Sequence, residues 1–348
     1  MYGGRSAEHE VSLRSAKSVL EHLDQQKYQA VPIAIDKQGQ WLLNDLSILP
    51  ESHDEAVSVQ NQYSSKAIFT PAPQQELHFD VVFPVMHGTL GEDGALQGLL
   101  ELANIPYVGC GVLASAMCMD KDIAKRLAQQ VGVPTPKYLV VRRSVMQRLD
   151  ALQADIDQQL SYPVFVKPAN TGSSVGINKV MNADGLATAL QAAFAFDNKV
   201  LIEQAVDARE IEIAVLQSLD DGEPLVSDIA GEVINAAGEF YTYEAKYSET
   251  SQTQLQVPAQ LDGTTLTTIQ CYARRIFTAL ECQGMARIDF FVERHTQTVY
   301  FNEINTIPGF TTISLYPRVW EVSGMPYTEL LTHLIELALK NSHAGTAE

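Results

Sequence analysis

The sequence predicts a mixed α/β fold whose N-terminal part is a doubly wound parallel sheet. Apolar strand patterns alternate with helical patterns over residues 11–108, which is the order of βαβ units. Beyond residue 110, strand patterns follow one another with fewer helices between them, which indicates further sheet-based domains. The ligand edge of an open parallel sheet lies at the carboxyl ends of its strands. Polar residues that follow a strand are therefore the first candidates for a site.

The N-terminal elements follow from the spacing of apolar residues. A recurrence every three or four positions predicts a helix, and a short apolar run that ends at a turn predicts a strand. The stretch 36–78 is polar and rich in Ser, Gln and Pro, so we expect irregular structure or a partial hairpin there. The predicted elements are a helix over 11–23, a strand over 30–35, a buried parallel strand over 80–86, a helix over 93–103 and a short strand over 105–108.

The second part of the chain is richer in strand patterns. A helix over 121–131 ends where Gly and Pro interrupt the pattern, and alternation over 210–216 predicts a half-buried strand. The polar stretch 244–256 is of the type expected in a mobile lid. The other predicted elements are strands over 138–141, 164–167, 176–180 and 200–203, and helices over 184–194, 262–280 and 327–339.

Composition and charge exclude several classes of protein. The chain has 348 residues, enough for two or three domains, and it is 46% hydrophobic, as ordinary globular proteins are. A net charge of −18 argues against nonspecific binding to nucleic acid or to anionic membranes. We find no apolar segment of membrane-spanning length and no signal peptide, so we expect a cytoplasmic protein. The four cysteines lack a metal-binding spacing, and we expect reduced core thiols.

A pair of predicted strands carries the most informative residues. Side chains two apart on a strand share a face, so Arg287 faces the same way as Asp289, and Glu303 the same way as Asn305. Turn-like residues separate the two apolar runs, which predicts a hairpin with all four side chains on one face. Such hard oxygen ligands suit Mg²⁺ that also binds substrate phosphates. The alternative is a surface hairpin with ordinary charges, which the flanking apolar residues disfavour.

The glycine-rich loop 170–176 follows a predicted strand that ends near Lys167. Gly, Ser and Thr permit a tight loop whose inward N–H groups can hold phosphate. This is not the P-loop pattern, because no Gly-Lys-Ser/Thr follows, and a plain hairpin turn is the alternative. With Lys167 at the entry of the loop, we favour phosphate binding.

Two further lysines have an ordinary interpretation as well as a functional one. Lys121 lies in the first turn of a helix, where the dipole disfavours a cation, so on its own it is a solvated lysine. Lys246 and Tyr247 begin the predicted lid, and a closing loop could bring them to phosphate and substrate together. A solvated amphipathic strand is the alternative for that segment.

Several polar residues at the ends of elements remain open between two interpretations. Glu203 ends an apolar strand and Glu210 follows it, so they could accept from ribose hydroxyls or an adenine amine, or be exposed acids. Glu10 near a helix N-terminus is favoured by the dipole, but it could instead receive a substrate ammonium. His87 lies at a strand end on the expected ligand edge, where structural and functional roles are equally favoured.

Together these segments resemble the D-alanine–D-alanine ligase family of the ATP-grasp superfamily. No single phrase would suffice, but the match runs over nearly the whole chain, and its order and spacing make it specific. The phrases that carry it are GGRSAEHEVSL (3–13), HGTLGEDGALQG (87–98), MDKDIAKRL (119–127), FVKPANTGSSVG (165–176), REIEIAVL (209–216), YEAKY (243–247), GMARIDFF (284–291) and NEINTIPGFTTISLYP (302–317).

The resemblance implies an ATP-grasp fold with an N-terminal α/β domain over 1–108, a central domain over 109–201 and a C-terminal domain over 202–348. ATP would lie between the last two domains together with Mg²⁺ or Mn²⁺. The implied activity joins two D-alanine molecules through a D-alanyl phosphate and supplies D-Ala-D-Ala for peptidoglycan precursors. ATP and D-alanine are the implied partners, and the implied assembly is a homodimer.

The resemblance also implies a role for each candidate residue. Those for the amino acids are Glu10 for the first ammonium, Ser173 and Tyr247 linked to Glu10, Arg287 and the Gly309 N–H for the reacting carboxylate, Ser314 and Leu315 for the second carboxylate, and His87 in the substrate site. Those for ATP are Lys121, Lys167, Ser174, Glu203, Val206, Glu210 and Lys246. The metal ligands are Asp289, Glu303 and Asn305. Tyr247 resembles the dipeptide-forming members rather than those that make a D-lactate ester.

One departure from the family pattern is plain. Members have an apolar strand that leads into the Gly-Gly turn, whereas only Met1 and Tyr2 precede Gly3, so we expect that strand to be missing. Two rival functions remain. One is an ATP-grasp ligase for a different carboxylate and amine, which a substrate panel would reveal. The other is a non-catalytic nucleotide-binding or periplasmic-type sensor, which would bind its ligand without turnover.

Overall fold

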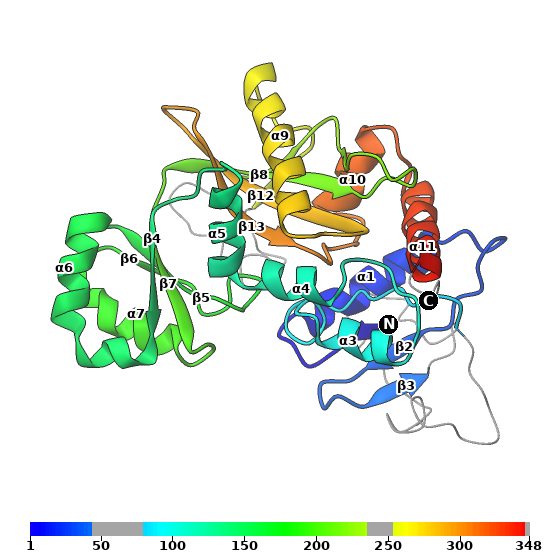
Figure 1. Cartoon of the computed structure of the whole chain (residues 1–348), viewed down its shortest axis with the longest axis horizontal. Helices are drawn as coiled ribbons and strands as arrows, with labels where there is room; N and C mark the ends of the chain where they lie inside the picture. The colour runs from blue at the N-terminus through cyan, green and yellow to red at the C-terminus, as the bar shows by residue number, and fades with distance from the viewer. Residues whose placement is uncertain (44–78, 235–252, 345–348) are drawn as a thin grey trace.

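The computed structural model describes residues 1–43, 79–234 and 253–344. Within these ranges the strands form three sheets, which we call the N-terminal, central and large sheets. Figure 1 shows the central sheet at one end of the molecule, the N-terminal sheet on the opposite side, and the large sheet between and above them. No helix in the described part of the chain is both long and apolar enough to cross a lipid bilayer.

The N-terminal sheet begins with a very short strand. Strand β1 (Tyr2–Gly3) pairs in parallel with β2 (Ile33–Ile35), which pairs antiparallel with β3 (Trp41–Leu43). Helix α1 (His9–His22) joins β1 to β2, as the βαβ order predicted. The prediction that the first strand is missing is therefore wrong. Met1 adds to the pairing, since its nitrogen donates to Phe83 O at 2.8 Å and its carbonyl accepts from Val85 N at 2.9 Å.

The predicted strands over 80–86 and 105–108 are reduced to one bridge. Val82 and Tyr107 form an isolated parallel bridge, although α3 (Ala95–Leu102) lies between them as predicted. The apolar residues are buried, but Val85 hydrogen-bonds Met1 instead of extending a ladder beside Tyr107. An apolar run identifies a buried segment more surely than it identifies the pairing partner.

The central sheet is antiparallel throughout. Its order is β4 (Tyr138–Arg142), β7 (Lys199–Gln204), β5 (Val164–Pro168) and β6 (Asn178–Val180), which confirms the predicted strands. One apolar core joins this sheet to α6 (Leu149–Gln159) and α7 (Leu186–Ala193), which follow the 3-10 turns η2 (Arg143–Gln147) and η3 (Ala183–Gly185). The predicted domain boundary at 201/202 falls inside β7.

The large sheet has an apolar core packed on each of its faces. Its order is β11 (Gln254–Gln256), β10 (Gly231–Ile234), β8 (Ala208–Leu216), β12 (Met285–Glu293) and β13 (Val299–Asn305), with β9 (Leu225–Val226) beside β8. Along β8, Ile211, Ile213 and Val215 belong to one core, and Ala214 and Leu216 to the other. The first core includes α4 (Val112–Met119), α5 (Lys121–Gln130) and α9 (Gly263–Ala279). The second includes α1, α10 (Leu315–Val322) and α11 (Tyr327–Ala344).

Two features of the large sheet fix the position of the candidate site. The predicted hairpin is confirmed, because β12 and β13 pair antiparallel with Asp289 opposite Glu303 and Arg287 opposite Asn305. Helix α5, which confirms the prediction over 121–131, lies between the central and large sheets (Figure 1). The predicted lid lies outside the described residues except for 253–256, which include β11.

Candidate functional site

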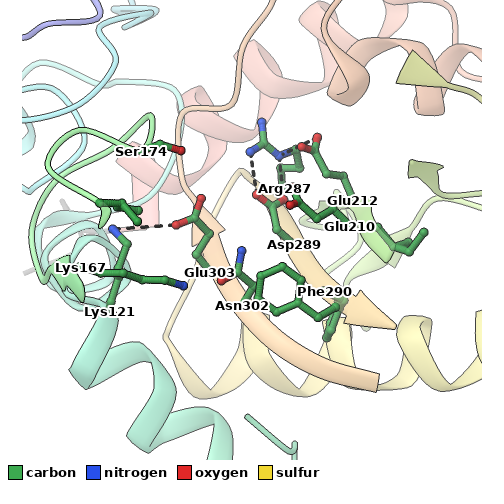
Figure 2. A pocket seen from close by; sticks show the side chains of 13 residues that line it. Lys121, Lys167, Ser174, Glu210, Glu212, Arg287, Asp289, Phe290, Asn302 and Glu303 are labelled. Atoms are coloured by element: carbon green, nitrogen blue, oxygen red, sulfur yellow. Dashed lines mark hydrogen bonds and ion pairs between the residues drawn. The ribbon is translucent and has the colours of Figure 1, made fainter. Parts of the chain in front are cut away.

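A cleft opens between the central and large sheets, and Figure 2 shows its polar side chains. One wall is acidic, and the side chains that face it from the other sheet and from α5 are cationic. This arrangement suits a ligand that carries both phosphates and a metal ion. The polar lining residues are Glu210 and Glu212 on β8, Arg287 and Asp289 on β12, Asn302 and Glu303 on β13, Lys167 on β5, Ser174 in the glycine-rich loop and Lys121 on α5.

The acidic hairpin residues form the floor of the cleft. Asp289 is only 8% exposed, and its Oδ2 accepts from Asn305 Nδ2 at 3.1 Å. Glu303 Oε2 lies 3.8 Å from Lys121 Nζ. Among the described residues, no three His, Cys, Asp or Glu side chains lie close enough together to hold a metal ion by themselves. The predicted ligands Asp289, Glu303 and Asn305 supply two carboxylates and one amide. Such hard oxygen donors fit Mg²⁺, which takes its other ligands from substrate phosphates and water.

Arg287 lies between two carboxylates. Its Nε and Nη2 donate to the two oxygens of Asp289 at 2.8 and 2.7 Å, and Nε lies 3.0 Å from Glu212 Oε2 (Figure 2). Burial would lower the pKa of Arg287, but Asp289 and Glu212 outweigh it and raise that pKa well above its ordinary value. Glu212 was not among the residues predicted from the sequence. Its spacing of two from Glu210 on one strand was the available signal.

Lys121 is held at the edge of the cleft rather than in solvent. Its Nζ donates to Thr171 O at 2.5 Å, and its backbone N–H donates to Ala169 O at 3.0 Å. Asp120 caps the same helix by accepting from the N–H groups of Asp122 and Ile123 at 3.1 Å. The interpretation of Lys121 as a solvated surface lysine is therefore wrong, and the helix start presents its ammonium group to the glycine-rich loop.

Glu203 is not the exposed acid that one interpretation of the sequence predicted. It is 1% exposed, with Lys167 Nζ 2.5 Å from Oε1 and Lys125 Nζ 2.7 Å from Oε2. Burial would raise the pKa of Glu203, but the two lysines lower it to about 2. Both oxygens have lysine partners in the described structure, and a contact of this side chain with ribose or adenine stays a prediction. Lys125 was missed, although it lies one helical turn after Lys121.

The glycine-rich loop turns through left-handed backbone conformations. Ser173 and Ser174 have φ angles of 48° and 60°, and Gly176 has φ 74°. Left-handed conformations are uncommon for residues with a side chain, and they cluster at sites that bind ligands. Val175 N donates to Gly172 O at 3.1 Å, which closes the turn, and Ser174 lines the cleft. Two successive left-handed residues closed by this hydrogen bond are also the geometry of a type I′ hairpin turn, and the flanking strands β5 and β6 do pair antiparallel. The loop is therefore a hairpin connection, and phosphate binding by it stays a prediction.

The structure brings Glu8, not Glu10, to the site. Ser173 Oγ donates to Glu8 Oε1. The Glu8 carboxylate also packs against two glycines, since a Cβ atom would lie 2.5 Å from it at Gly88 and 2.8 Å from it at Gly172. Glu10 is exposed and pairs with Lys37 at 2.8 Å. The predicted link from Ser173 to Glu10 is wrong, because the first turn of α1 directs Glu10 outward. Both acids lie in the same short phrase, and the sequence did not distinguish them.

His87 is buried beside the loop that follows β13. Its Nδ1 lies 2.9 Å from Ile307 O, and its Nε2 lies 3.0 Å from Ser15 Oγ. Glu92, which was not predicted from the sequence, accepts from Gly88 N at 2.5 Å and from Ile307 N at 3.3 Å. Burial and then Glu8 raise the pKa of Glu92 to about 8. His87 and Glu92 therefore tie the N-terminal part of the chain to the loop that carries Gly309.

The residues expected near the amino acids after β13 lie together. A Cβ at Gly309 would meet Ser314 Oγ at 2.7 Å, and Ser314 Oγ also accepts from Thr311 N at 3.1 Å. Ser314 and Leu315 stand at the start of α10, where backbone N–H groups suit a carboxylate. Val206 lies in the link between β7 and β8, and Lys246 and Tyr247 lie outside the described residues.

The cysteines are free thiols, as predicted. Cys110, Cys118 and Cys282 are buried, and Cys271 is half-buried. Burial raises the pKa of Cys118, which indicates an unreactive core thiol.

Comparison with known proteins identifies the family. Residues 1–110 match the model of the D-Ala–D-Ala ligase N-terminus, and residues 127–336 match that of its C-terminus. The chain belongs to the D-alanine–D-alanine ligase family. It is 49% identical to D-alanine–D-alanine ligase A of Bradyrhizobium diazoefficiens, over 97% of this chain and 94% of that one. It is 45% identical to the D-alanine–D-alanine ligase of Legionella pneumophila, again over 97% and 94%.

Solved structures agree with this assignment. The D-alanine–D-alanine ligase from Coxiella burnetii superposes with a TM-score of 0.83 at 36% identity, over 99% of this chain and 94% of that one. The VanG D-Ala:D-Ser ligase from Enterococcus faecalis also has a TM-score of 0.83, at 35% identity and over 97% of both chains. The predicted ATP-grasp fold is confirmed.

Proposed function

We propose that this chain is an ATP-dependent ligase that joins two D-alanine molecules into the dipeptide used for peptidoglycan precursors. The observation that carries the proposal is the cleft that combines the Asp289–Glu303 pair, the lysines opposite it and Arg287. The full-length likeness to D-alanine–D-alanine ligases supports the same activity. We also propose the division into three domains, with the second boundary moved past Gln204 so that β7 stays in the central sheet.

ATP is proposed to lie in this cleft, with its phosphates beside the cations. Lys121 and Lys167 approach from α5 and β5, and the glycine-rich loop offers Ser174. Val206, Glu210 and Lys246 are the further proposed contacts for the nucleotide. Asp289, Glu303 and Asn305 would hold Mg²⁺ or Mn²⁺, which supplies charge neutralisation on the phosphates when bound.

The first D-alanine is proposed to lie between Glu8 and Arg287. Glu8 receives the ammonium group, which orients the substrate and prevents that amine from attacking. The guanidinium of Arg287 and the N–H of Gly309 stabilise the carboxylate as one of its oxygens attacks the terminal phosphorus of ATP and ADP leaves. The product of this step is D-alanyl phosphate.

The second D-alanine is proposed to dock its carboxylate at the start of α10, where Ser314 and Leu315 lie. Its neutral amine attacks the carbonyl carbon of the acyl phosphate, and phosphate leaves with its electron pair. A free α-amino group has a pKa of about 8, so little help is needed to remove its proton. His87 is not proposed as the base, because Ser15 and the carbonyl of Ile307 engage its two ring nitrogens.

A substrate panel tests this proposal. The purified chain is incubated with ATP, Mg²⁺ and D-alanine, D-serine, D-lactate or L-alanine, and phosphate release and product masses are measured together. We expect D-alanine alone to give D-Ala-D-Ala and one phosphate per dipeptide. A product with another amine or acid, at a higher kcat/KM, would assign a different ligase activity. Nucleotide binding without any product would indicate a sensor.

A further inference from the structure

The buried pair of Lys125 and Glu203 lies behind the cleft and takes no direct part in the proposed reaction. We propose that Lys125 is a positioning residue for ATP binding, because it neutralises Glu203 and so leaves Lys167 available to the phosphates. The inference rests on the proposed function in one respect, namely that Lys167 contacts the phosphates of ATP.

Lys125 connects three elements at the back of the cleft. It projects from α5, and its Nζ lies 2.7 Å from Glu203 Oε2 on β7 and 3.4 Å from the carbonyl of Phe301 on β13. The side chain is 1% exposed and lies beside the rings of Tyr138 and Phe301. It therefore contacts both the central and the large sheet, and unlike Lys167 it does not line the cleft.

The charge balance explains why a second lysine is needed. Glu203 carries one negative charge, and each of its oxygens has a lysine as partner. Without Lys125, the buried carboxylate would depend on Lys167 alone, and moving Lys167 toward a phosphate would leave an uncompensated buried charge. With Lys125 present, Glu203 stays neutralised while Lys167 shifts. Lys125, Glu203 and Lys167, which we call the charge trio, together keep a net charge of +1 next to the cleft.

Stability alone does not require this arrangement. Burying ions is costly, and replacing a buried ion pair by apolar residues is often neutral or stabilising. Lys121 and Lys125 lie four positions apart on α5, so they share one face of the helix. One ammonium group reaches the glycine-rich loop, and the other connects through Glu203 to the ammonium group of Lys167. Helix α5 thus acts on the phosphate site at two points.

The test varies the charge of the trio. Lys125→Met lowers its net charge from +1 to 0, and Lys125→Met combined with Glu203→Gln restores +1. Binding of a non-hydrolysable ATP analogue with Mg²⁺ and binding of adenosine are measured by calorimetry, with thermal unfolding beside them. We expect Lys125→Met to weaken the analogue at least tenfold and adenosine less than twofold. The double variant should bind the analogue within threefold of the wild type.

The control variant is Ile269→Val on α9, a small deletion in the core of the large sheet. It should lower the thermal midpoint without changing the affinity for the analogue. Equal weakening of adenosine and analogue by Lys125→Met would overturn the inference, and so would a double variant that stays tenfold weak. If Lys125→Met does not fold, the double variant alone decides by the same threshold. A wild-type chain that binds the analogue but forms no dipeptide would refute the proposed function only.

Discussion

Arg287 is the residue on which the proposed reaction depends most. In the described structure its guanidinium forms ion pairs with both Asp289 and Glu212. A substrate carboxylate that approaches Arg287 therefore replaces one of these partners or joins them. The strong pairing keeps the guanidinium oriented before the substrate arrives, which is the preorganisation that transition-state stabilisation needs.

Replacing Arg287 by Ala should lower turnover at least a hundredfold with little change in the affinity for ATP. Losing one transition-state donor costs about 2.7–4 kcal/mol, which corresponds to that factor. The matched control is Arg209→Ala, since Arg209 forms a similar two-point pair with Glu232. Steady-state kinetics with both variants measure the difference. Near-normal turnover of Arg287→Ala would remove this residue from the reaction.

Glu8 and Glu10 offer a matched pair in one short phrase. Glu8→Gln removes the charge that faces Ser173, so we expect the KM for the first D-alanine to rise at least tenfold. Glu10→Gln removes only an exposed pair with Lys37, and such pairs contribute about 0.2–1 kcal/mol or less. Its kinetics should match the wild type. If Glu10→Gln is the impaired variant, the placing of the ammonium at Glu8 is wrong.

Glu92 predicts a dependence of stability on pH. Burial, and then the nearby Glu8 carboxylate, raise its pKa from the ordinary value of 4.5 to about 8 in the folded chain. Between these values the unfolded state loses the proton first, so stability falls as pH rises and levels off above the folded pKa. The glutamine of Glu92→Gln does not titrate, so it adds no pH dependence to the free energy of unfolding. Denaturant unfolding at several pH values should therefore show the variant gaining on the wild type from about pH 4.5 to pH 8. Parallel curves would contradict the raised pKa.

Helix α5 illustrates how an element positions a site. Asp120 caps its first turn and also pairs with Lys199 of β7, so the cap fixes the helix start against the central sheet. Lys121, the next residue, thereby stays at the glycine-rich loop.

Two aspartate caps allow this to be tested. Asp120→Ala and Asp262→Ala remove the same two-bond N-cap, the second on α9. Each cap contributes roughly 0.5–2 kcal/mol of stability. We expect both variants to unfold more easily and only Asp120→Ala to weaken ATP binding. Calorimetry with an ATP analogue measures this, and equal affinities in the two variants would separate the cap from the site.

The sequence predicts some elements better than others for a local reason. The β12–β13 hairpin and the position of Asp289 opposite Glu303 follow from alternation along adjacent segments. The pairing of Glu203 with Lys125 and Lys167 depends on three elements that meet only in the folded chain. The short β1 was not predicted for the same reason, because Met1 is held by residues 83 and 85, far along the sequence.

On the scale of the whole molecule, residues from the parts that carry the three sheets meet around the proposed reaction site. Glu8, His87 and Glu92 come from the N-terminal part, the glycine-rich loop and Lys167 from the central sheet, and Arg287 and Asp289 from the large sheet. Contacts from Ser173 to Glu8 and from His87 to Ile307 link these parts. The homodimer implied by the family stays a prediction, which light scattering of the purified chain would check.

The central claim is that the cleft activates a carboxylate by phosphorylation before an amine attacks it. D-alanine labelled with ¹⁸O in its carboxylate tests this directly, with mass spectrometry of the phosphate released during dipeptide synthesis. We predict that each phosphate carries one ¹⁸O atom from D-alanine, because the attacking oxygen leaves with phosphorus. Dipeptide formed with unlabelled phosphate would contradict the account.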